Sequence, residues 1–134
     1  TENPTLLIDL ATLTSACMVA LGPQTAAIFA ADDALAEDIR VIGQRCGENF
    51  WRLPLDADLA DQLKSDIADT KNTGERWGGA ITAALFLQRF VGDRVNWAHL
   101  DIAGPATMES EHPYIPKGGA GFAVRTLIGL INRA

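Results

Sequence analysis

The chain has 134 residues, which suits one domain, and its 48% hydrophobic composition is sufficient for a packed core. The formal net charge of -6 and the pI near 4.7 argue against a nucleic-acid partner, because a phosphate backbone requires a basic surface. The chain shows no apolar run near the roughly 20 residues of a membrane span and no secretory leader. We therefore expect a cytoplasmic protein that does not contact a membrane.

The first predicted element is a strand over residues 6–10, which are apolar apart from Asp9. Such a run is typical of a buried parallel strand with neighbours on both sides, so the start of the chain looks like a linker within a larger unit or a processed end. A buried carboxylate needs a donor, so we expect Asp9 to accept from a helix N-terminus or a basic side chain. Thr12, Thr14 and Ser15 follow, and their hydroxyls are suited to capping a helix or contacting a ligand.

A short helix is predicted over residues 16–21, ended by Gly22 and Pro23. Residues 25–30 form a second apolar run that we interpret as a strand. The length of chain between the two strands is enough for a right-handed crossover, so the sequence predicts that they are parallel.

A longer helix begins at Asp32 or Asp33 and ends at Gly47. Its apolar residues recur at spacings of four, three and four, which places them on one helical face: Leu35, Ile39, Ile42 and Cys46. That face is predicted to pack on the core.

The middle of the chain alternates extended, polar and apolar segments. Residues 50–55 are predicted to be extended at a sheet edge or in a loop, and residues 56–63 form a helical turn or two. Residues 64–76 are polar and lack a clean period, which indicates an ordered loop. Residues 80–91 are apolar almost all round, which is typical of a helix buried on most of its circumference.

The last third is predicted to contain an alternating strand over residues 95–103, a loop over 107–121 and a helix over 122–132. Alternating β and α elements indicate a layered α/β fold. Three strands alone would leave long bare edges, so the pattern also suggests further segments that cover the sheet.

Two pairs of residues with ionisable side chains are candidate sites. His99 and Asp101 lie on one face of the predicted strand, where they could form a metal or acid/base pair. The favoured alternative is a buried histidine hydrogen-bonded to a neighbour, with Asp101 holding a loop. Asp66 and Asp69 lie in the polar loop, where solvated or capping carboxylates are more common than metal ligands.

The remaining motifs are weaker. Residues 118–121 suggest a phosphate cradle, yet they lack the spacing of either glycine-rich phosphate motif, so a tight turn is favoured. Cys17 and Cys46 lie in apolar patterns without zinc-ligand spacing, which favours packed thiols in a reducing compartment over a disulfide. The three tryptophans are interpreted as core or interface anchors: Trp51, Trp77 and Trp97.

Several long stretches resemble one family. Residues 7–16, Leu-Ile-Asp-Leu-Ala-Thr-Leu-Thr-Ser-Ala, resemble the Asp-Leu-Ala-Thr-Leu-Thr-Gly-Ala signature of the leucyl aminopeptidase (cytosol aminopeptidase) family of dinuclear metal peptidases. Further stretches match in the same order, and the similarity runs essentially end to end: 65–74, 79–87, 97–106 and the tail 116–127.

The resemblance implies that residues 1–134 are the C-terminal segment of such a catalytic domain, without the N-terminal domain and the metal-binding motifs. The implied fold is α/β, a three-layer αβα arrangement with a mostly parallel sheet, as in the C-terminal portion of a zinc-peptidase-like domain. Family members use two divalent ions, Mn or Zn, to release N-terminal leucine-like residues from peptides, and they are typically hexamers. The implied partners are a peptide substrate, the upstream half of the catalytic domain and further copies of the chain.

The family's metal ligands and catalytic lysine and arginine lie in motifs upstream of the opening strand, so the resemblance assigns no catalytic or metal residue to this chain. It assigns substrate binding instead. Thr12 and Leu13 match residues whose backbone meets the peptide, Ser15 lies beside them, and Ala103 and Ala106 match positions that line the pocket for the first side chain.

Two positions depart from the family pattern. Ser15 replaces a glycine, so its extra atoms are expected to crowd the pocket or tilt the turn. Ala120 replaces a threonine in the closing motif. The alternatives to a peptidase segment are a truncated, non-catalytic peptide-binding or assembly fragment and an independent fold with its own metal at His99 and Asp101.

Overall fold

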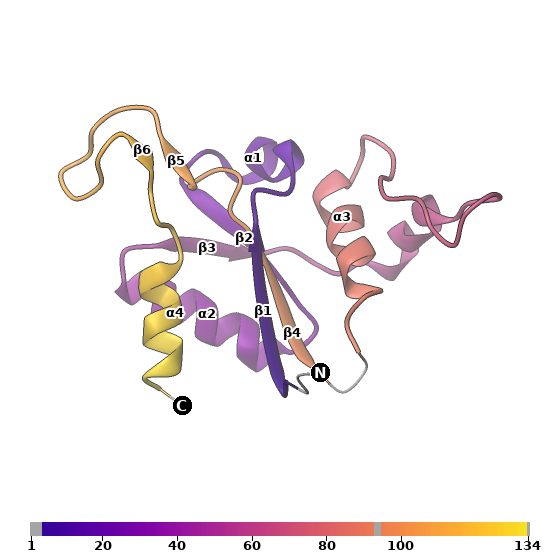
Figure 1. Ribbon diagram of the computed structural model, residues 1–134, viewed down its shortest axis with the longest axis horizontal. Helices are drawn as coiled ribbons and strands as arrows, with labels where there is room; N and C mark the ends of the chain where they lie inside the picture. Colours follow the sequence, from indigo (N-terminus) through magenta and orange to yellow (C-terminus); the bar gives the residue numbers. More distant parts are fainter. Residues whose placement is uncertain (1–3, 93–94, 134) are drawn as a thin grey trace.

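The structure is a computed structural model that describes residues 4–92 and 95–133. Its main sheet has four strands in the order β1 (Leu6–Ala11), β4 (Asn96–Asp101), β2 (Thr25–Ala30) and β3 (Asn49–Arg52). Helices lie on both sides of these strands, which gives the expected three-layer α/β arrangement (Figure 1).

The two helical layers pack on opposite faces of the sheet. Helices α2 (Asp33–Arg45) and α4 (Val124–Ile131) lie on one side, and α1 (Ser15–Leu21) and α3 (Gly79–Gln88) lie on the other (Figure 1). Each face has its own apolar cluster, one around Ile28 and one around Phe29. Because adjacent strand residues point to opposite faces, strand β2 supplies the centre of both clusters.

The prediction for α2 is confirmed. Asp32 is the N-cap residue, and its carboxylate accepts a hydrogen bond from Leu35 N at 2.8 Å. Three of the four predicted apolar positions are buried along the helix, Leu35, Ile39 and Ile42, and the fourth, Cys46, is the half-buried C-cap residue.

The prediction that the first two strands are parallel is wrong. Strand β4 pairs in parallel with β1 and antiparallel with β2, so it lies between them. The turn after β1 and the short helix α1 therefore return the chain in the opposite direction to β1. Strand β3 then pairs in parallel with β2, and the sheet is mostly parallel, as predicted.

The prediction of a fully buried first strand is also wrong for the described part of the chain. Strand β1 is an edge strand with β4 as its only neighbour, and Leu6 and Leu7 are 47% and 38% exposed. The apolar composition of β1 indicates that the strand can be buried. Whether it is buried depends on which other segments pack against it.

The remaining elements refine the predictions. Residues 57–63 form the 3₁₀ helix η1 (Ala57–Leu63), and the predicted loop over 107–121 contains two short paired strands, β5 (Thr107–Met108) and β6 (Gly118–Gly119). Trp97 is buried, as expected for a core anchor, whereas Trp51 and Trp77 are exposed and do not belong to the core. Among the helices of the described ranges, none combines the length and apolar character needed to cross a membrane.

Candidate functional site

The turn between β1 and α1 contains three of the predicted substrate-binding residues. Thr14 is the N-cap of α1, and its hydroxyl oxygen accepts a hydrogen bond from Cys17 N at 3.0 Å, so the predicted capping role falls to this threonine. Thr12, Leu13 and Ser15 are exposed. Ser15 is the first residue of α1, and its φ is not positive, so a serine fits this turn without the backbone strain expected from losing a glycine.

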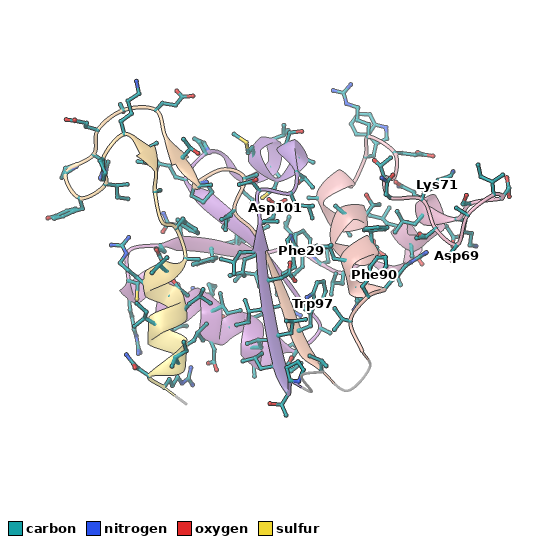
Figure 2. All side chains as sticks on the ribbon, in the orientation of Figure 1. Phe29, Asp69, Lys71, Phe90, Trp97 and Asp101 are labelled. Carbon is teal, nitrogen blue, oxygen red and sulfur yellow. The ribbon has the colours of Figure 1, made fainter. Side chains whose placement is uncertain are left out.

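The carboxylate of Asp101, at the end of β4, holds this turn in place. Asp101 Oδ1 accepts from Leu13 N at 3.1 Å, and Oδ2 accepts from Thr14 N at 3.1 Å and Thr14 Oγ1 at 2.7 Å. The side chain is fully buried. The favoured prediction, that Asp101 holds a loop, is therefore confirmed, and Figure 2 shows the residue beneath α1 at the end of the central strands.

The second predicted turn, residues 103–106, is bound to the same carboxylate. Ala103 N donates to Asp101 Oδ1 at 3.1 Å. One oxygen atom thus accepts from Leu13 and from Ala103, which brings together two turns that are far apart in the sequence. Ala103 and Ala106 are half-buried.

Neighbouring backbone fixes the far end of this second turn. Ala106 N donates to Ile102 O at 3.0 Å, and Ala120 N donates to Ala106 O at 2.9 Å. The segment 118–121 therefore pairs with the turn through backbone groups. Its first two residues are strand β6, which pairs with β5, so the predicted tight turn is replaced here by a short strand.

A groove of about 640 Å³ begins at Ser15. It lies between α1 and the start of α3, and its lining includes Val19 and Trp77. Ala103 and Ala106 do not line it. The structure thus places Ser15 at an open apolar groove and the two alanines at the neighbouring turn.

Asp9 and His99 form a separate network on the same face of the sheet. Asp9 Oδ1 lies 2.5 Å from His99 Nδ1, and Trp97 Nε1 donates to Asp9 Oδ2 at 2.6 Å. The His99 ring stacks between Trp97 and Phe29, with interplanar angles of 17° and 22°. The prediction of a buried histidine hydrogen-bonded to a neighbour is confirmed. The predicted basic partner of Asp9 is the His99 imidazole, and the Trp97 indole donates a second hydrogen bond to Asp9.

The side chains of the described residues do not provide a dinuclear metal site. His99 Nε2 is buried without a hydrogen-bond partner among the described residues, yet no group of three potential ligands from His, Cys, Asp and Glu lies together within 4–92 and 95–133. Both oxygens of Asp101 already accept from donors. Asp69 lies on the loop between η1 and α3, far from Asp101 (Figure 2), and Asp66 is exposed on the same loop.

The Cys17 thiol is packed beneath the site. Its Sγ lies 3.6 Å from the carbonyl oxygen of Asp101, and burial, followed by the negative charge of Asp101, raises the pKa of this thiol. A thiol held protonated in this way is a poor nucleophile. Both cysteines are free thiols, as predicted.

Glu48 is a buried carboxylate that the sequence analysis missed. It is 1% exposed, and its oxygens accept from Ala123 N at 3.0 Å, Thr126 N at 2.9 Å and Thr126 Oγ1 at 2.6 Å. Arg125 Nε lies 3.5 Å away. Glu48 therefore caps the start of α4, and the only sequence signal was an acid between a helix-ending glycine and an apolar strand.

Comparison with known proteins identifies close relatives. The family model described as "Cytosol aminopeptidase family, catalytic domain" matches residues 1–128. A probable cytosol aminopeptidase from Oleidesulfovibrio alaskensis is 55% identical over 128 residues, which is 96% of this chain and 25% of that relative.

Solved structures agree in fold. A mutant of tomato leucine aminopeptidase superposes with a TM-score of 0.90 at 43% sequence identity, covering 97% of this chain and 25% of that one. The bottromycin maturation enzyme BotP in complex with Mn superposes with a TM-score of 0.90 at 51% identity, covering 96% of this chain and 29% of that one.

The chain spans about a quarter of the length of the curated relatives that it matches. The matched residues include the four-stranded sheet and both turns that Asp101 joins. The chain therefore belongs to the cytosol aminopeptidase family.

Proposed function

We propose that this chain is the C-terminal, substrate-binding segment of a metal-dependent aminopeptidase that releases N-terminal leucine-like residues from peptides. The observation that carries the proposal is the family match over residues 1–128, within which the two turns assigned to substrate binding lie against one carboxylate. Two strand ends that meet at one edge of an α/β sheet are the usual place for a ligand in this class of fold.

The proposed contacts follow from exposure and size. Thr12 and Leu13 are exposed at the end of β1, where their backbone is accessible to an extended peptide. Asp101 accepts from the N–H groups of Leu13 and Thr14, so the turn offers a peptide its carbonyl oxygens and its exposed side chains. Ala103 and Ala106 are small enough to leave apolar space for a leucine side chain, and Ser15 borders the adjoining groove.

The metal site is proposed to lie in the preceding part of the enzyme. In this family type, two divalent ions, Mn or Zn, activate a water molecule and polarise the scissile carbonyl. One structural relative is described as a complex with Mn, which supports a divalent ion in this fold. The contribution of this chain is to bind and orient the peptide.

The uncovered surface supports a partner segment. The free edge of β1 exposes Leu6 and Leu7, and α4 exposes an apolar stripe at spacings of four and three: Val124, Ile128 and Ile131. We infer that the upstream half of the catalytic domain covers these surfaces and that the complete enzyme is a homo-oligomer, a hexamer as in the family. The name of the curated relatives supports a cytosolic location.

A chimaera tests the proposal. The matched segment of tomato leucine aminopeptidase is replaced by this chain, and hydrolysis of leucine p-nitroanilide is measured with Mn²⁺ and with a chelator. We expect chelator-sensitive turnover by the chimaera and none by this chain alone, because the metal ligands come from the other segment.

The unmodified tomato enzyme is the control for the substrate and the metal loading. A chimaera that is folded and contains bound metal, but does not hydrolyse the substrate, would contradict the proposal. That result would favour the alternative of a non-catalytic peptide-binding or assembly fragment.

A further inference from the structure

Among the described residues, Asp101 is the one side chain that hydrogen-bonds to both turns assigned to substrate binding. We propose that it is the positioning residue of the substrate site: its buried carboxylate sets the separation of the two turns and thereby the preference for a leucine-like side chain. This inference rests on the proposed peptidase function, and it concerns a residue that does not itself reach the peptide.

The chemistry of the contact requires a carboxylate. An ionised aspartate is an acceptor at both oxygens, and Asp101 meets only donors: three backbone N–H groups and the Thr14 hydroxyl. Hydrogen bonds to an ionised acceptor are about twice as strong as neutral ones. Asparagine has the same shape, but each Asp101 oxygen accepts from two donors, so the amide NH₂ would face two of them and leave at least one backbone N–H without an acceptor.

The position of Asp101 suits a positioning role. The residue ends the central strand β4, which is paired on both sides, so its backbone is held by the sheet. It is fully buried, so it acts through Leu13, Thr14 and Ala103. A displacement of about 1 Å in a binding group can cost about 100-fold in rate, so a loosened pair of turns is expected to lose discrimination between similar side chains.

Asp9 offers a matched control within the same strands. Its carboxylate also links β1 to β4, through Trp97 and His99, but it contacts neither turn. Asp9→Asn and Asp101→Asn each replace a carboxylate by an amide, at a half-buried side chain in Asp9 and at a fully buried one in Asp101. A purely structural role of Asp101 would leave the substrate preference unchanged in both variants.

The first measurement is the ratio of kcat/KM for leucine p-nitroanilide to kcat/KM for alanine p-nitroanilide. It is made in the Mn²⁺-loaded peptidase that contains both this chain and the upstream half of the catalytic domain. We expect Asp101→Asn to lower this ratio about tenfold, within the range that hydrophobic pockets provide. Asp9→Asn is expected to lower the melting temperature and to leave the ratio unchanged.

The second measurement is hydrogen–deuterium exchange, which does not depend on catalysis. In Asp101→Asn the amides of Leu13, Thr14 and Ala103 should exchange about tenfold faster, the factor expected when a charge-assisted bond is lost. In Asp9→Asn they should exchange as in the parent protein. If the parent cleaves neither substrate, the proposed function fails while the exchange data still decide the role of Asp101.

A second pair of variants applies if Asp101→Asn does not fold. Thr14→Ala removes the hydroxyl that donates to Asp101, and Thr14→Ser retains it. We expect a partial fall in the leucine preference in Thr14→Ala and its recovery in Thr14→Ser. Equal ratios and equal exchange in the Asp101 and Asp9 variants, or no change in Asp101→Asn, would overturn the inference.

Discussion

Gly104 illustrates how single residues shape the site. The sequence marked it only as the end of a strand, but the structure gives the reason for a glycine. A Cβ at this position would lie 2.6 Å from the carbonyl oxygen of Gly22, which follows α1. The close approach of two backbone segments brings the 103–106 turn against the end of the helix that starts at the other turn.

Replacing Gly104 by alanine should therefore displace backbone. We expect Gly104→Ala to lower the free energy of unfolding by about 1–3 kcal/mol, the range for overpacking a rigid site. Gly119→Ala is the matched control, because a Cβ there meets nothing within 4 Å, and its effect should stay within about 0.5 kcal/mol. Urea unfolding measures both, and equal losses would contradict the steric explanation.

Helix α4 illustrates how an element can depend on a distant residue. Its N-cap residue, Ala123, has a φ of 73° and provides no side-chain cap. The acceptor comes instead from Glu48, which is 75 residues away in the sequence from Ala123. A carboxylate at a helix N-terminus also interacts favourably with the helix dipole. The sequence around residue 122 therefore lacked the usual start signal for this helix.

Glu48→Gln should destabilise α4, because the amide NH₂ would oppose backbone donors in a buried site. We expect a loss of about 1–3 kcal/mol in the free energy of unfolding, the cost of leaving a buried donor unsatisfied. Glu37→Gln is the control, since Glu37 is an exposed residue of α2 whose carboxylate pairs with Arg40 at the surface, and the melting temperature of this variant should be unchanged. Similar melting temperatures for the two variants would contradict the capping role.

The surface of the whole molecule carries apolar residues that its own elements do not cover. They include the edge strand β1 and the stripe on α4. Exposed edges and contiguous apolar residues are typical of interfaces. This surface is the one that we propose to be covered by the upstream half of the enzyme.

Purified by itself, the chain is expected to self-associate through this surface. Ile131→Lys, on the α4 stripe, should shift the population toward monomer in sedimentation velocity. Ile67→Lys is the matched control, because Ile67 is 98% exposed but lies on the polar loop after η1, away from α4. If the parent is monomeric at high concentration, or if both variants behave alike, the stripe is not an association surface.

Local patterns determined much of the fold. The cap at Asp32, the apolar face of α2 and the alternation of β4 were readable because each depends on residues within a few positions of one another. The four resembling motifs, from residues 7–16 to 97–106, also located the two candidate turns. These predictions concern which residues form an element and which face they present.

Only the tertiary structure decided which elements meet. Periodicity indicates that β1 and β2 are strands, but not that β4 lies between them. Periodicity places His99 and Asp101 on one face of the strand, but it does not indicate that Asp101 accepts a hydrogen bond from Leu13, 88 residues away. Such partners are selected by packing across the whole chain, because a donor or a strand edge can be satisfied by any segment that folds against it. The sequence by itself therefore determined the longer helices and strands, the family and the candidate turns, whereas the tertiary contact at Asp101 decided how the turns are joined.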